Sequence, residues 1–380
     1  MPVTPFSILA KPTGAICNLD CHYCYYLSKE KLYPGSRFRM SDDVLEEYLR
    51  QLLDTESDVT VAWQGGEPMM MGLDFFKRSI EIVEKHRRRG QRVAHTLQTN
   101  STLVGDEWAA FLSEHGFLVG VSIDGPRDLH DAYRKDRRGE GSFDRVIAGY
   151  EMLRRHGVEM NILCTVHTTN QGYPLEVYRF FRDELDARFI QFIPIVESPV
   201  TDRSVDAARF GAFLTTIFDE WFYHDIGDVY VQHFDVALAA WHGVPGGLCI
   251  FAETCGDALA LEHNGDLYSC DHFVEPDHLL GNITATPMSD LARSENQHLF
   301  GQAKAELPEY CRSCDVRFAC NGGCPKNRFI RTPDGEEGLN YLCAGYKAFF
   351  AHVDGPMRLM SDLLNRGLPP AQAPGLLAMD

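Results

Sequence analysis

FSILAKPTGAICNLDCHYC, residues 6–24, joins a short apolar run to a loop with three cysteines. Residues 6–11 have the length and composition of a buried strand. Cys17, Cys21 and Cys24 follow in the spacing C-x3-C-x2-C. A four-iron cluster normally takes four thiolates, so three thiolates would leave one iron free to bind another molecule. An open metal position is typical of a catalytic site, whereas a structural site fills every position.

Zinc is the alternative metal for these three thiols. Zinc sites usually draw their third and fourth ligands from a second pair of residues. No such pair lies near this loop in the sequence, and the chain has twelve cysteines without a secretory signal. Cysteines kept in a reducing compartment point to metal rather than to disulfides. The loop is therefore interpreted as an iron–sulfur site.

Strand-like and helix-like segments alternate from the first strand to about residue 200. Repeated strand–helix units demand a parallel sheet with helices packed on it. Six units are fewer than the eight of a closed barrel, so the predicted fold class is α/β, a partial (β/α)6 barrel similar to a TIM barrel, with its active site at the carboxyl ends of the strands. The predicted strands are 6–11, 59–64, 92–98, 117–123, 159–166 and 188–196, and the predicted helices are 42–53, 73–89, 106–115, 143–156 and 174–185.

The segment QGGEP, residues 64–68, follows the second predicted strand. Two adjacent glycines let the backbone come close to a ligand and expose its polar groups. Alone, this string fits a plain turn equally well. Its position next to the cysteine loop indicates a ligand-binding loop at the same end of the sheet. Asn100 follows the third strand, and Ser122 and Asp124 close the fourth.

The chain changes in character from about residue 235, where strands become short and turns become frequent. Residues 259–273 predict a hairpin that turns at Asn264-Gly265. Eight thiols suffice for two fully ligated four-iron clusters, with two zinc sites as the alternative. These thiols belong to Cys249, Cys255, Cys270, Cys311, Cys314, Cys320, Cys324 and Cys343. We therefore expect a barrel with a bridging helix (1–234), a small cysteine-rich domain (235–350), and a C-terminal helix with a loose tail (351–380).

The chain has 380 residues and a formal net charge of −18. An acidic protein repels nucleic-acid phosphates, so no nucleic-acid partner is expected. The sequence has no apolar run of the roughly 18 residues that a membrane span needs, and its N-terminus lacks the regions of a secretory signal. These observations predict a cytoplasmic protein without a membrane partner. Because no exposed apolar stripe stands out, a monomer is expected.

Together, the cysteine loop and QGGEP resemble the radical S-adenosylmethionine (SAM) superfamily, over about residues 6–230. In that family the open iron binds SAM, and one electron from the reduced cluster cleaves SAM to a 5′-deoxyadenosyl radical. The resemblance implies a set of SAM-binding residues. They are Tyr23, Gln64, Gly66, Glu67, Ser122, Arg134 and Ile195.

The later cysteines resemble the SPASM domain of peptide-modifying radical SAM enzymes, in which the ligands are divided non-sequentially. The resemblance implies two auxiliary clusters, the first on Cys249, Cys255, Cys270 and Cys324 and the second on Cys311, Cys314, Cys320 and Cys343. With the first loop, the implied cofactors are SAM and three [4Fe–4S] clusters.

Residues 255–283, with QGGEP, LQTN and SIDGP, are similar to the anaerobic sulfatase-maturating enzymes. This resemblance implies oxidation of a specific Cys or Ser of a sulfatase to Cα-formylglycine. It also implies that Asp271, directly after Cys270, is the general base. The implied partners are an unfolded or nascent sulfatase chain with a Cys/Ser-x-Pro-x-Arg segment and a ferredoxin or flavodoxin reductant, since glutathione is too weak a reductant for SAM cleavage.

Several alternatives stay open at this point. Asp271 fits equally well as a hairpin-end residue with local hydrogen bonds. A different SPASM maturase, which forms thioether or carbon–carbon crosslinks in a precursor peptide, has the same core chemistry. The first strand begins by about residue 6 and leaves no room for the recognition domain of many such enzymes. A non-catalytic iron–sulfur carrier or zinc-stabilised binding module is disfavoured by the open first site. The target residue is cysteine, serine or both, and the sequence does not distinguish these three alternatives.

Overall fold

The strand β1 (Ser7–Lys11) has sheet neighbours on both sides. The computed structural model describes residues 6–377. Backbone contacts divide them into two compact units. Unit 1 contains the residues up to 122, 131–160 and 256–303, and unit 2 contains 123–130, 161–255 and the residues from 304 onward.

Unit 1 is built on a sheet with the strand order β10-β9-β8-β1-β2-β3-β4. Strand pairs from β8 through β1 to β4 are parallel, whereas β9 is antiparallel to β8 and to β10. Parallel strands bring the loops at their carboxyl ends to one edge of the sheet. The further strands are β2 (Asp58–Trp63), β3 (Arg92–Thr99), β4 (Phe117–Ser122), β8 (Ala258–Glu262), β9 (Asp266–Tyr268) and β10 (Leu279–Asn282).

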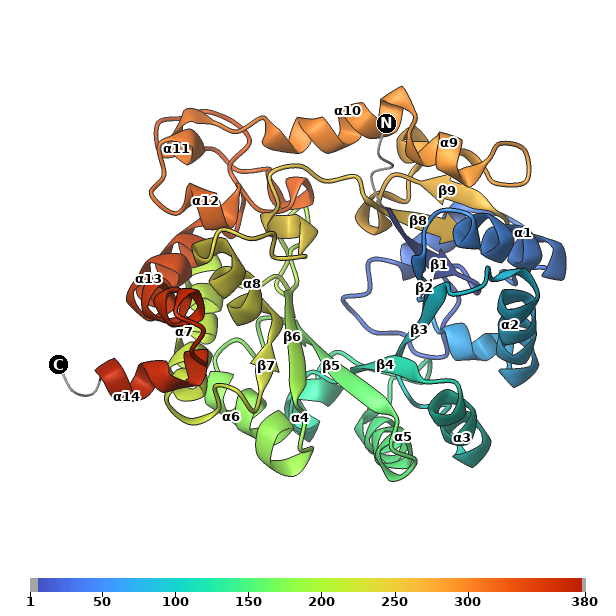
Figure 1. The fold of residues 1–380 in the computed structure, drawn as a ribbon, viewed down its shortest axis with the longest axis horizontal. Coiled ribbons are helices and arrows are strands. Elements are labelled where there is room, and N and C mark those ends of the chain that lie inside the picture. The colour runs from blue at the N-terminus through green and yellow to red at the C-terminus, as the bar shows by residue number, and fades with distance from the viewer. Residues whose placement is uncertain (1–5, 378–380) are drawn as a thin grey trace. The chain divides into compact units, whose positions relative to one another are not determined.

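Helices α1 and α2 pack against each other alongside β1 to β3 (Figure 1). The helices of unit 1 are α1 (Asp42–Leu53), α2 (Leu73–His86), α3 (Asp106–Glu114), α5 (Phe143–Arg155), α9 (Met288–Ala292) and α10 (Glu295–Gln302). Its short helical turns are η1 (Leu27–Leu32), η2 (Pro68–Met71), η5 (Asp271–Phe273) and η6 (Pro276–His278).

Helix α1 shows how the sequence determines these elements. Ser41 caps it by accepting a hydrogen bond from the Val44 N–H at 3.3 Å, and two aspartates in its first turn favour the helix dipole. Its apolar residues recur at helical spacing and bury one face. Tyr48 on that face packs edge-on against Trp63 of β2, with ring centroids 5.8 Å apart.

Unit 2 contains the parallel strands β5 (Glu159–Val166), β6 (Phe189–Pro194) and β7 (Tyr230–Val231), although the first two residues of β5 fall in unit 1. Its longer helices α7 and α13 pack along each other (Figure 1). The helices are α4 (Arg127–Asp131), α6 (Pro174–Arg179), α7 (Ala207–His224), α8 (Gln232–Trp241), α11 (Glu309–Arg312), α12 (Arg317–Cys320), α13 (Cys343–Asn365) and α14 (Ala373–Leu377). The turns are η3 (Phe180–Glu184), η4 (Cys249–Phe251), η7 (Ala303–Ala305), η8 (Pro325–Asn327) and η9 (Pro370–Gln372).

All six strands predicted for the first half of the chain are present, and α1 has the predicted bounds. The helix predicted at 174–185 instead ends as α6, and a π-helical turn, η3, follows. Phe180 and Phe181, at the start of this turn, are both buried. Residues 232–241 form a helix, α8, that was not predicted from the sequence, and His233, Phe234, Val236 and Ala237 of this helix are buried.

The predicted hairpin is β8–β9, and Gly265 in its turn has φ +92°. Its first strand pairs with β1, with Lys11 opposite Glu262. The hairpin thereby extends the sheet of unit 1 and brings residues 256–303 into that unit. The division into 1–234, 235–350 and 351–380 stays a prediction.

Candidate active site

The glycine loop and the cysteine loop are packed backbone against backbone. The Gly66 N–H donates to the Gly14 carbonyl at 2.8 Å, and the Glu67 N–H donates to the Ile16 carbonyl at 2.9 Å. A Cβ atom on Gly66 would lie 2.0 Å from the Ile16 carbonyl oxygen. Gly65 has φ +131°, which favours glycine. The two glycines therefore allow the loop after β2 to reach the start of the cysteine loop.

Glu67 anchors the glycine loop from within. It is 0% exposed, and its carboxylate accepts hydrogen bonds from the N–H groups of Met69 (3.0 Å) and Asn100 (2.8 Å) and from the Thr99 hydroxyl (2.8 Å). Burial raises the pKa of Glu67 to about 7, although these hydrogen bonds lower it. Because the carboxylate is engaged by the protein, the predicted contact of Glu67 with SAM would have to come from its backbone.

The cysteine loop is held in place by the segment that follows α4. The Asp20 N–H donates to the Lys135 carbonyl at 2.8 Å, and the His22 N–H donates to the Tyr133 carbonyl at 3.0 Å. The guanidinium of Arg137 donates to the carbonyl of Cys17 at 2.8 Å. These hydrogen bonds hold the backbone of the cysteine loop in place.

Cys17 is surrounded by donors that suit an iron ligand. Its sulfur accepts hydrogen bonds from the Leu19 N–H at 3.4 Å and from Asn100 Nδ2 at 3.6 Å. Burial raises the pKa of the Cys17 thiol to about 12, and the charge of Glu67 adds to this effect. N–H donors directed at sulfur are a recognised means of tuning iron–sulfur potentials. The loop therefore fits the proposed cluster.

The residues predicted to bind SAM are distributed over both units. In unit 1, the guanidinium of Arg134 lies over the Tyr23 ring, 5.6 Å from its centroid. Ser122, the last residue of β4, accepts a hydrogen bond from Gln98 at 2.9 Å. Ile195 belongs to unit 2, where it is half-buried directly after β6.

Lys11 is a buried cation that belongs to none of the motifs in the sequence. It is 1% exposed at the end of β1, and its ammonium forms an ion pair with Asp271. It also donates to Gln64 at 2.8 Å and lies 4.5 Å from the centroid of the Tyr26 ring. The available signal was a lysine at the end of an otherwise apolar strand. Lys11 connects two predicted site residues, Gln64 of the glycine loop and Asp271.

Asp271 is contacted from two sides. Besides the ion pair with Lys11, it accepts a hydrogen bond from the Tyr25 hydroxyl at 2.5 Å. Burial raises the pKa of Asp271, but the charges of Lys11 and His272 and the two hydrogen bonds outweigh burial, so the net pKa lies below its usual value. Its side chain is 15% exposed. An ionised and accessible carboxylate is able to accept a proton.

Four of the later cysteines line one small cavity in unit 2. They are Cys311, Cys314, Cys320 and Cys343. Burial raises the pKa of Cys320 to about 12 and that of Cys343 to about 11. Metal binding to such thiols is coupled to loss of their protons. Four thiols around one cavity fit the ligand set proposed for the second auxiliary cluster.

The thiols proposed for the first auxiliary cluster come from both units. Cys249, Cys255 and Cys324 lie in unit 2 and interact electrostatically with one another. Cys270 lies in unit 1. There Gln297 donates to the carbonyls of Gly256 (2.6 Å) and Ser269 (3.1 Å), the sequence neighbours of Cys255 and Cys270.

Over residues 6–377, no three His, Cys, Asp or Glu side chains converge as they would on a single metal ion. Thiolates of a four-iron cluster bind separate irons and need not converge in this way.

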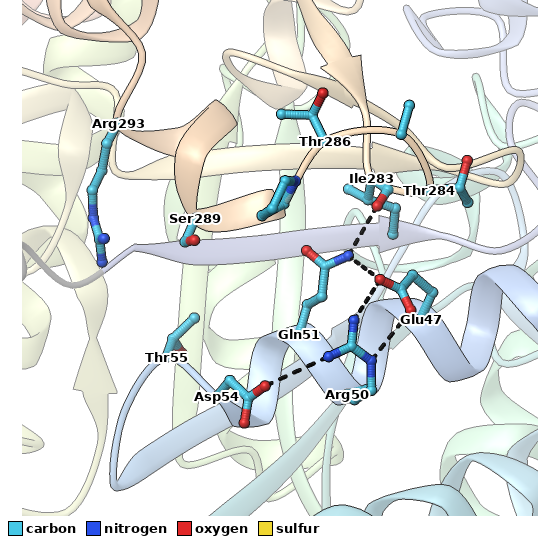
Figure 2. A pocket seen from close by; sticks show the side chains of 12 residues that line it. Glu47, Arg50, Gln51, Asp54, Thr55, Ile283, Thr284, Thr286, Ser289 and Arg293 are labelled. Atoms are coloured by element: carbon cyan, nitrogen blue, oxygen red, sulfur yellow. Dashed lines mark hydrogen bonds and ion pairs between the residues drawn. The ribbon is translucent and has the colours of Figure 1, made fainter.

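A polar groove of about 580 Å³ lies elsewhere on unit 1, between α1 and residues 283–293. Figure 2 shows the Arg50 side chain reaching both Glu47 and Asp54, and Gln51 donating to the Ile283 carbonyl. None of the predicted site residues lines this groove. It is not part of the candidate active site.

Comparison with known proteins agrees with this geometry. Residues 12–181 match the family model of the radical SAM superfamily, and residues 249–315 match that of the SPASM iron–sulfur cluster-binding domain. A serine-type anaerobic sulfatase-maturating enzyme of Bacteroides thetaiotaomicron is 45% identical, over 96% of this chain and 94% of the relative. A cysteine-type enzyme of Clostridium perfringens is 34% identical, over 92% of this chain and 96% of that relative.

Solved structures give the same result. The structure described as native anSMEcpe with bound AdoMet and Kp18Cys peptide has a TM-score of 0.86 and 32% identity, and covers 94% of this chain and 99% of that chain. Streptococcus suis SuiB with bound precursor peptide has a TM-score of 0.63, covers 90% of this chain and 76% of that chain, and at 16% identity shows a shared fold only.

The fold, the cysteine loop and the later cysteines thus define a radical SAM enzyme with a SPASM domain. The chain belongs to the anaerobic sulfatase-maturating enzymes. The predicted fold class, the radical SAM activity and the cofactors, SAM with three [4Fe–4S] clusters, are confirmed. In the described part of the chain, no helix has the length and apolar character of a membrane span.

Proposed function

We propose that this protein oxidises a specific Cys or Ser side chain of a sulfatase to Cα-formylglycine. The observation that carries the proposal is Asp271, an ionised, partly exposed carboxylate that directly follows a proposed cluster ligand. The substrate class is supported by the similarity to serine-type and cysteine-type sulfatase-maturating enzymes. The AdoMet and peptide named for the similar solved structure support a peptide substrate.

Several residues prepare the site for this chemistry. We propose that Cys17, Cys21 and Cys24 hold the SAM-binding cluster and that Tyr23, Gln64, Gly66, Glu67, Ser122, Arg134 and Ile195 surround SAM. The auxiliary clusters are assigned to the two sets of four cysteines given above. When bound, SAM and the clusters supply the radical oxidant and the electron acceptor for the target carbon.

Asp271 accounts for the proton of the target side chain. Oxidation of an alcohol or a thiol to a carbonyl requires loss of its O–H or S–H proton, and we assign this proton to the carboxylate of Asp271. The Lys11 ammonium orients that carboxylate, and the Tyr25 hydroxyl holds its second oxygen. A serine target gives the aldehyde directly, whereas a cysteine target also requires water and releases its sulfur.

We propose serine as the preferred target. The serine-type relative from Bacteroides thetaiotaomicron is 45% identical over 96% of the chain, whereas a serine-type relative from Klebsiella aerogenes is 33% identical over 95% and the cysteine-type relative from Clostridium perfringens is 34% identical over 92%. The further proposals are a ferredoxin or flavodoxin as electron donor, a monomeric state and a cytoplasmic location.

Anaerobic mass spectrometry tests this function. The reconstituted, reduced protein is incubated with SAM and with two peptides that carry Ser-x-Pro-x-Arg or Cys-x-Pro-x-Arg. The expected result is an aldehyde at the serine position, with release of 5′-deoxyadenosine. Faster conversion of the cysteine peptide would reverse the target preference. Release of deoxyadenosine without a change in either peptide would contradict the proposed substrate.

Asp271→Asn tests the assigned base in the same assay. Because general base catalysis contributes roughly 10²- to 10⁴-fold, peptide oxidation should fall by about 10²-fold or more, while deoxyadenosine release continues. Asp277→Asn, at an exposed position in η6, is the matched control and should retain the parent rate. Equal rates for both variants would remove Asp271 from the mechanism.

A further inference from the structure

Lys304 is a cation buried among the auxiliary cysteines of unit 2. It is 0% exposed, and its ammonium donates to the carbonyl oxygens of Cys249, at 2.8 Å, and Ala252. The strongest charge interactions of Lys304 are those with Arg328 and with the thiols of Cys249, Cys255 and Cys324, and within residues 6–377 its ammonium forms no ion pair with a carboxylate. Burial of an ammonium without a counter-charge is unfavourable. A nearby negative charge would stabilise this ammonium, and no carboxylate of the described chain provides one.

Arg328 is the second cation, and backbone carbonyls surround its guanidinium. Asn321, Gly322 and Gly323 have φ values of +45°, +70° and +62°, so three successive left-handed residues turn their carbonyls toward it. Such a run favours Asn and Gly. The accepting carbonyls are those of Gly322 (3.0 Å), Lys304 (2.7 Å), Glu306 (3.3 Å), Asn321 (3.0 Å) and Gly323 (3.2 Å).

This arrangement links the two auxiliary ligand sets. The left-handed run joins Cys320, assigned to the second cluster, to Cys324, assigned to the first. The charge of Arg328 interacts with thiols of both sets, which are Cys311 and Cys320 on one side and Cys255 and Cys324 on the other. The hydrogen bond from Arg328 to the Lys304 carbonyl joins the two cations.

We propose that Lys304 and Arg328 are positioning residues that hold the two auxiliary ligand loops together and, as fixed buried charges, raise the reduction potentials of the auxiliary clusters. A four-iron cluster with four thiolates carries negative charge, and reduction adds one more. A nearby cation out of water stabilises the reduced form more than the oxidised form, and net charge is one of the factors that set cluster potentials. Higher potentials would suit clusters that accept an electron rather than donate one.

The proposal for Lys304 and Arg328 rests on the ligand sets proposed above. The experiment therefore tests first whether these cysteines bind clusters, and then whether the two cations change the cluster potentials. The full-length chain with Cys17→Ala, Cys21→Ala and Cys24→Ala retains only the auxiliary sites, so about eight irons per chain are expected. Iron and sulfide analysis establishes cluster assembly. Failure of this parent to hold iron would reject the ligand assignment before any potential is measured.

Potentiometric titration followed by electron paramagnetic resonance then measures the potentials. Lys304→Met in this background should decrease the ratio of reduced to oxidised cluster by at least tenfold at a fixed potential, a shift of about 59 mV for a one-electron couple. Lys347→Met is the matched control, because Lys347 interacts with Cys314 and Cys343 but is exposed to water. The proposal is overturned if Lys304→Met holds its clusters and leaves the potential unchanged, or if Lys347→Met shifts it equally.

Arg328 provides a second, independent pair. Arg328→Lys keeps the charge with fewer donors, whereas Arg328→Met removes the charge. The lysine variant should retain the potentials of both clusters, and the methionine variant should lower both. If the Lys304→Met variant loses iron, the comparison of the two Arg328 variants tests the proposal instead. Equal potentials, or equal loss of iron, in the two Arg328 variants would overturn the proposal.

Discussion

Lys11, the last residue of β1, contacts Asp271, the proposed general base. Its ammonium is 1% exposed and contacts Asp271, Gln64 and the ring of Tyr26. Removal of one partner from a largely buried ion pair leaves the other charge uncompensated, which typically costs 3–5 kcal/mol. Lys11 is therefore expected to determine both the orientation and the ionisation of Asp271.

Lys11→Met tests this expectation, since methionine keeps much of the length and removes the charge. Loss of the ion pair should raise the pKa of Asp271 and reduce peptide oxidation at least tenfold, with a loss of unfolding free energy of about 3 kcal/mol. Iron content should stay at the parent value because Lys11 is not a proposed ligand. The measurements are the peptide assay, iron analysis and urea unfolding.

Lys29→Met is the control for this variant. Lys29 also forms an ion pair with a carboxylate, Glu275, at 3.2 Å, but the Glu275 side chain is 55% exposed. Exposed ion pairs contribute roughly 0–1 kcal/mol, so this variant should oxidise peptide at the parent rate. A similar loss of activity in both variants would show that Lys11 has no special role.

His233 in α8 predicts a pH dependence of stability. It is 2% exposed, neither ring nitrogen has a hydrogen-bond partner in the described chain, and burial lowers its pKa to about 4. Its pKa in the unfolded chain is about 6.5. The unfolded state therefore binds the proton more tightly, so stability is lost as the pH falls from about 6.5 toward 4.

His233→Leu should remove this part of the pH dependence. Between pH 7 and pH 5 the parent should lose about 2 kcal/mol more unfolding free energy than the variant, measured by urea unfolding at both pH values. His224→Leu replaces an exposed histidine and should keep the pH dependence of the parent. Parallel curves for the parent and His233→Leu would refute the prediction.

At the scale of elements, the contact between α7 and α13 depends on two glycines. A Cβ atom on Gly345 would lie 2.1 Å from the Ala207 carbonyl oxygen, and a Cβ atom on Gly211 would lie 2.6 Å from the Cα of Gly345. Gly355, also in α13, has no heavy atom within 4 Å of its ideal Cβ position. The same helix thus contains one glycine that packing requires and one that it does not.

Alanine at these two positions should have opposite effects. Gly345→Ala forces the helices apart, and overpacking typically costs about 1–3 kcal/mol. Gly355→Ala should stabilise the protein by about 0.5–1 kcal/mol, because alanine is the better helix former. Thermal unfolding followed by circular dichroism measures both. Destabilisation by Gly355→Ala equal to that by Gly345→Ala would contradict the assigned helix contact.

Local sequence patterns predicted the helices and strands well, but they did not predict which strands pair across long stretches of sequence. The bounds of α1 followed from Ser41 and a helical apolar repeat, and β5 followed from an apolar run. The cysteines proposed as cluster ligands were selected from their spacing alone. Lys11 could not be selected in this way, because its importance depends on β8 pairing with β1. Ser7 and Asp257, hydrogen-bonded at the start of this pairing, lie 250 residues apart, and no local signal encodes that choice.

Over the whole molecule, unit 1 is assembled from separate stretches of chain. β1 lies between β2 and β8, so it would become an edge strand without the residues after 255. The same residues provide Asp271 to Lys11 and Glu262 to the Tyr26 hydroxyl. Edge strands with unpaired backbone groups favour aggregation. Residues 1–234, predicted to form the barrel, therefore do not include β8, β9 and β10 of this sheet.

A fragment of residues 1–234 is therefore expected not to fold on its own. Without β8, the apolar β1 is unpaired along one side, and Lys11 is buried without Asp271, an uncompensated charge that typically costs 3–5 kcal/mol. That cost is a large part of the 5–15 kcal/mol that stabilises most proteins. Circular dichroism and urea unfolding should show reduced secondary structure and no cooperative transition, whereas the full chain should unfold cooperatively. A cooperative transition in the fragment would contradict this prediction and would favour an independent barrel ending near residue 234.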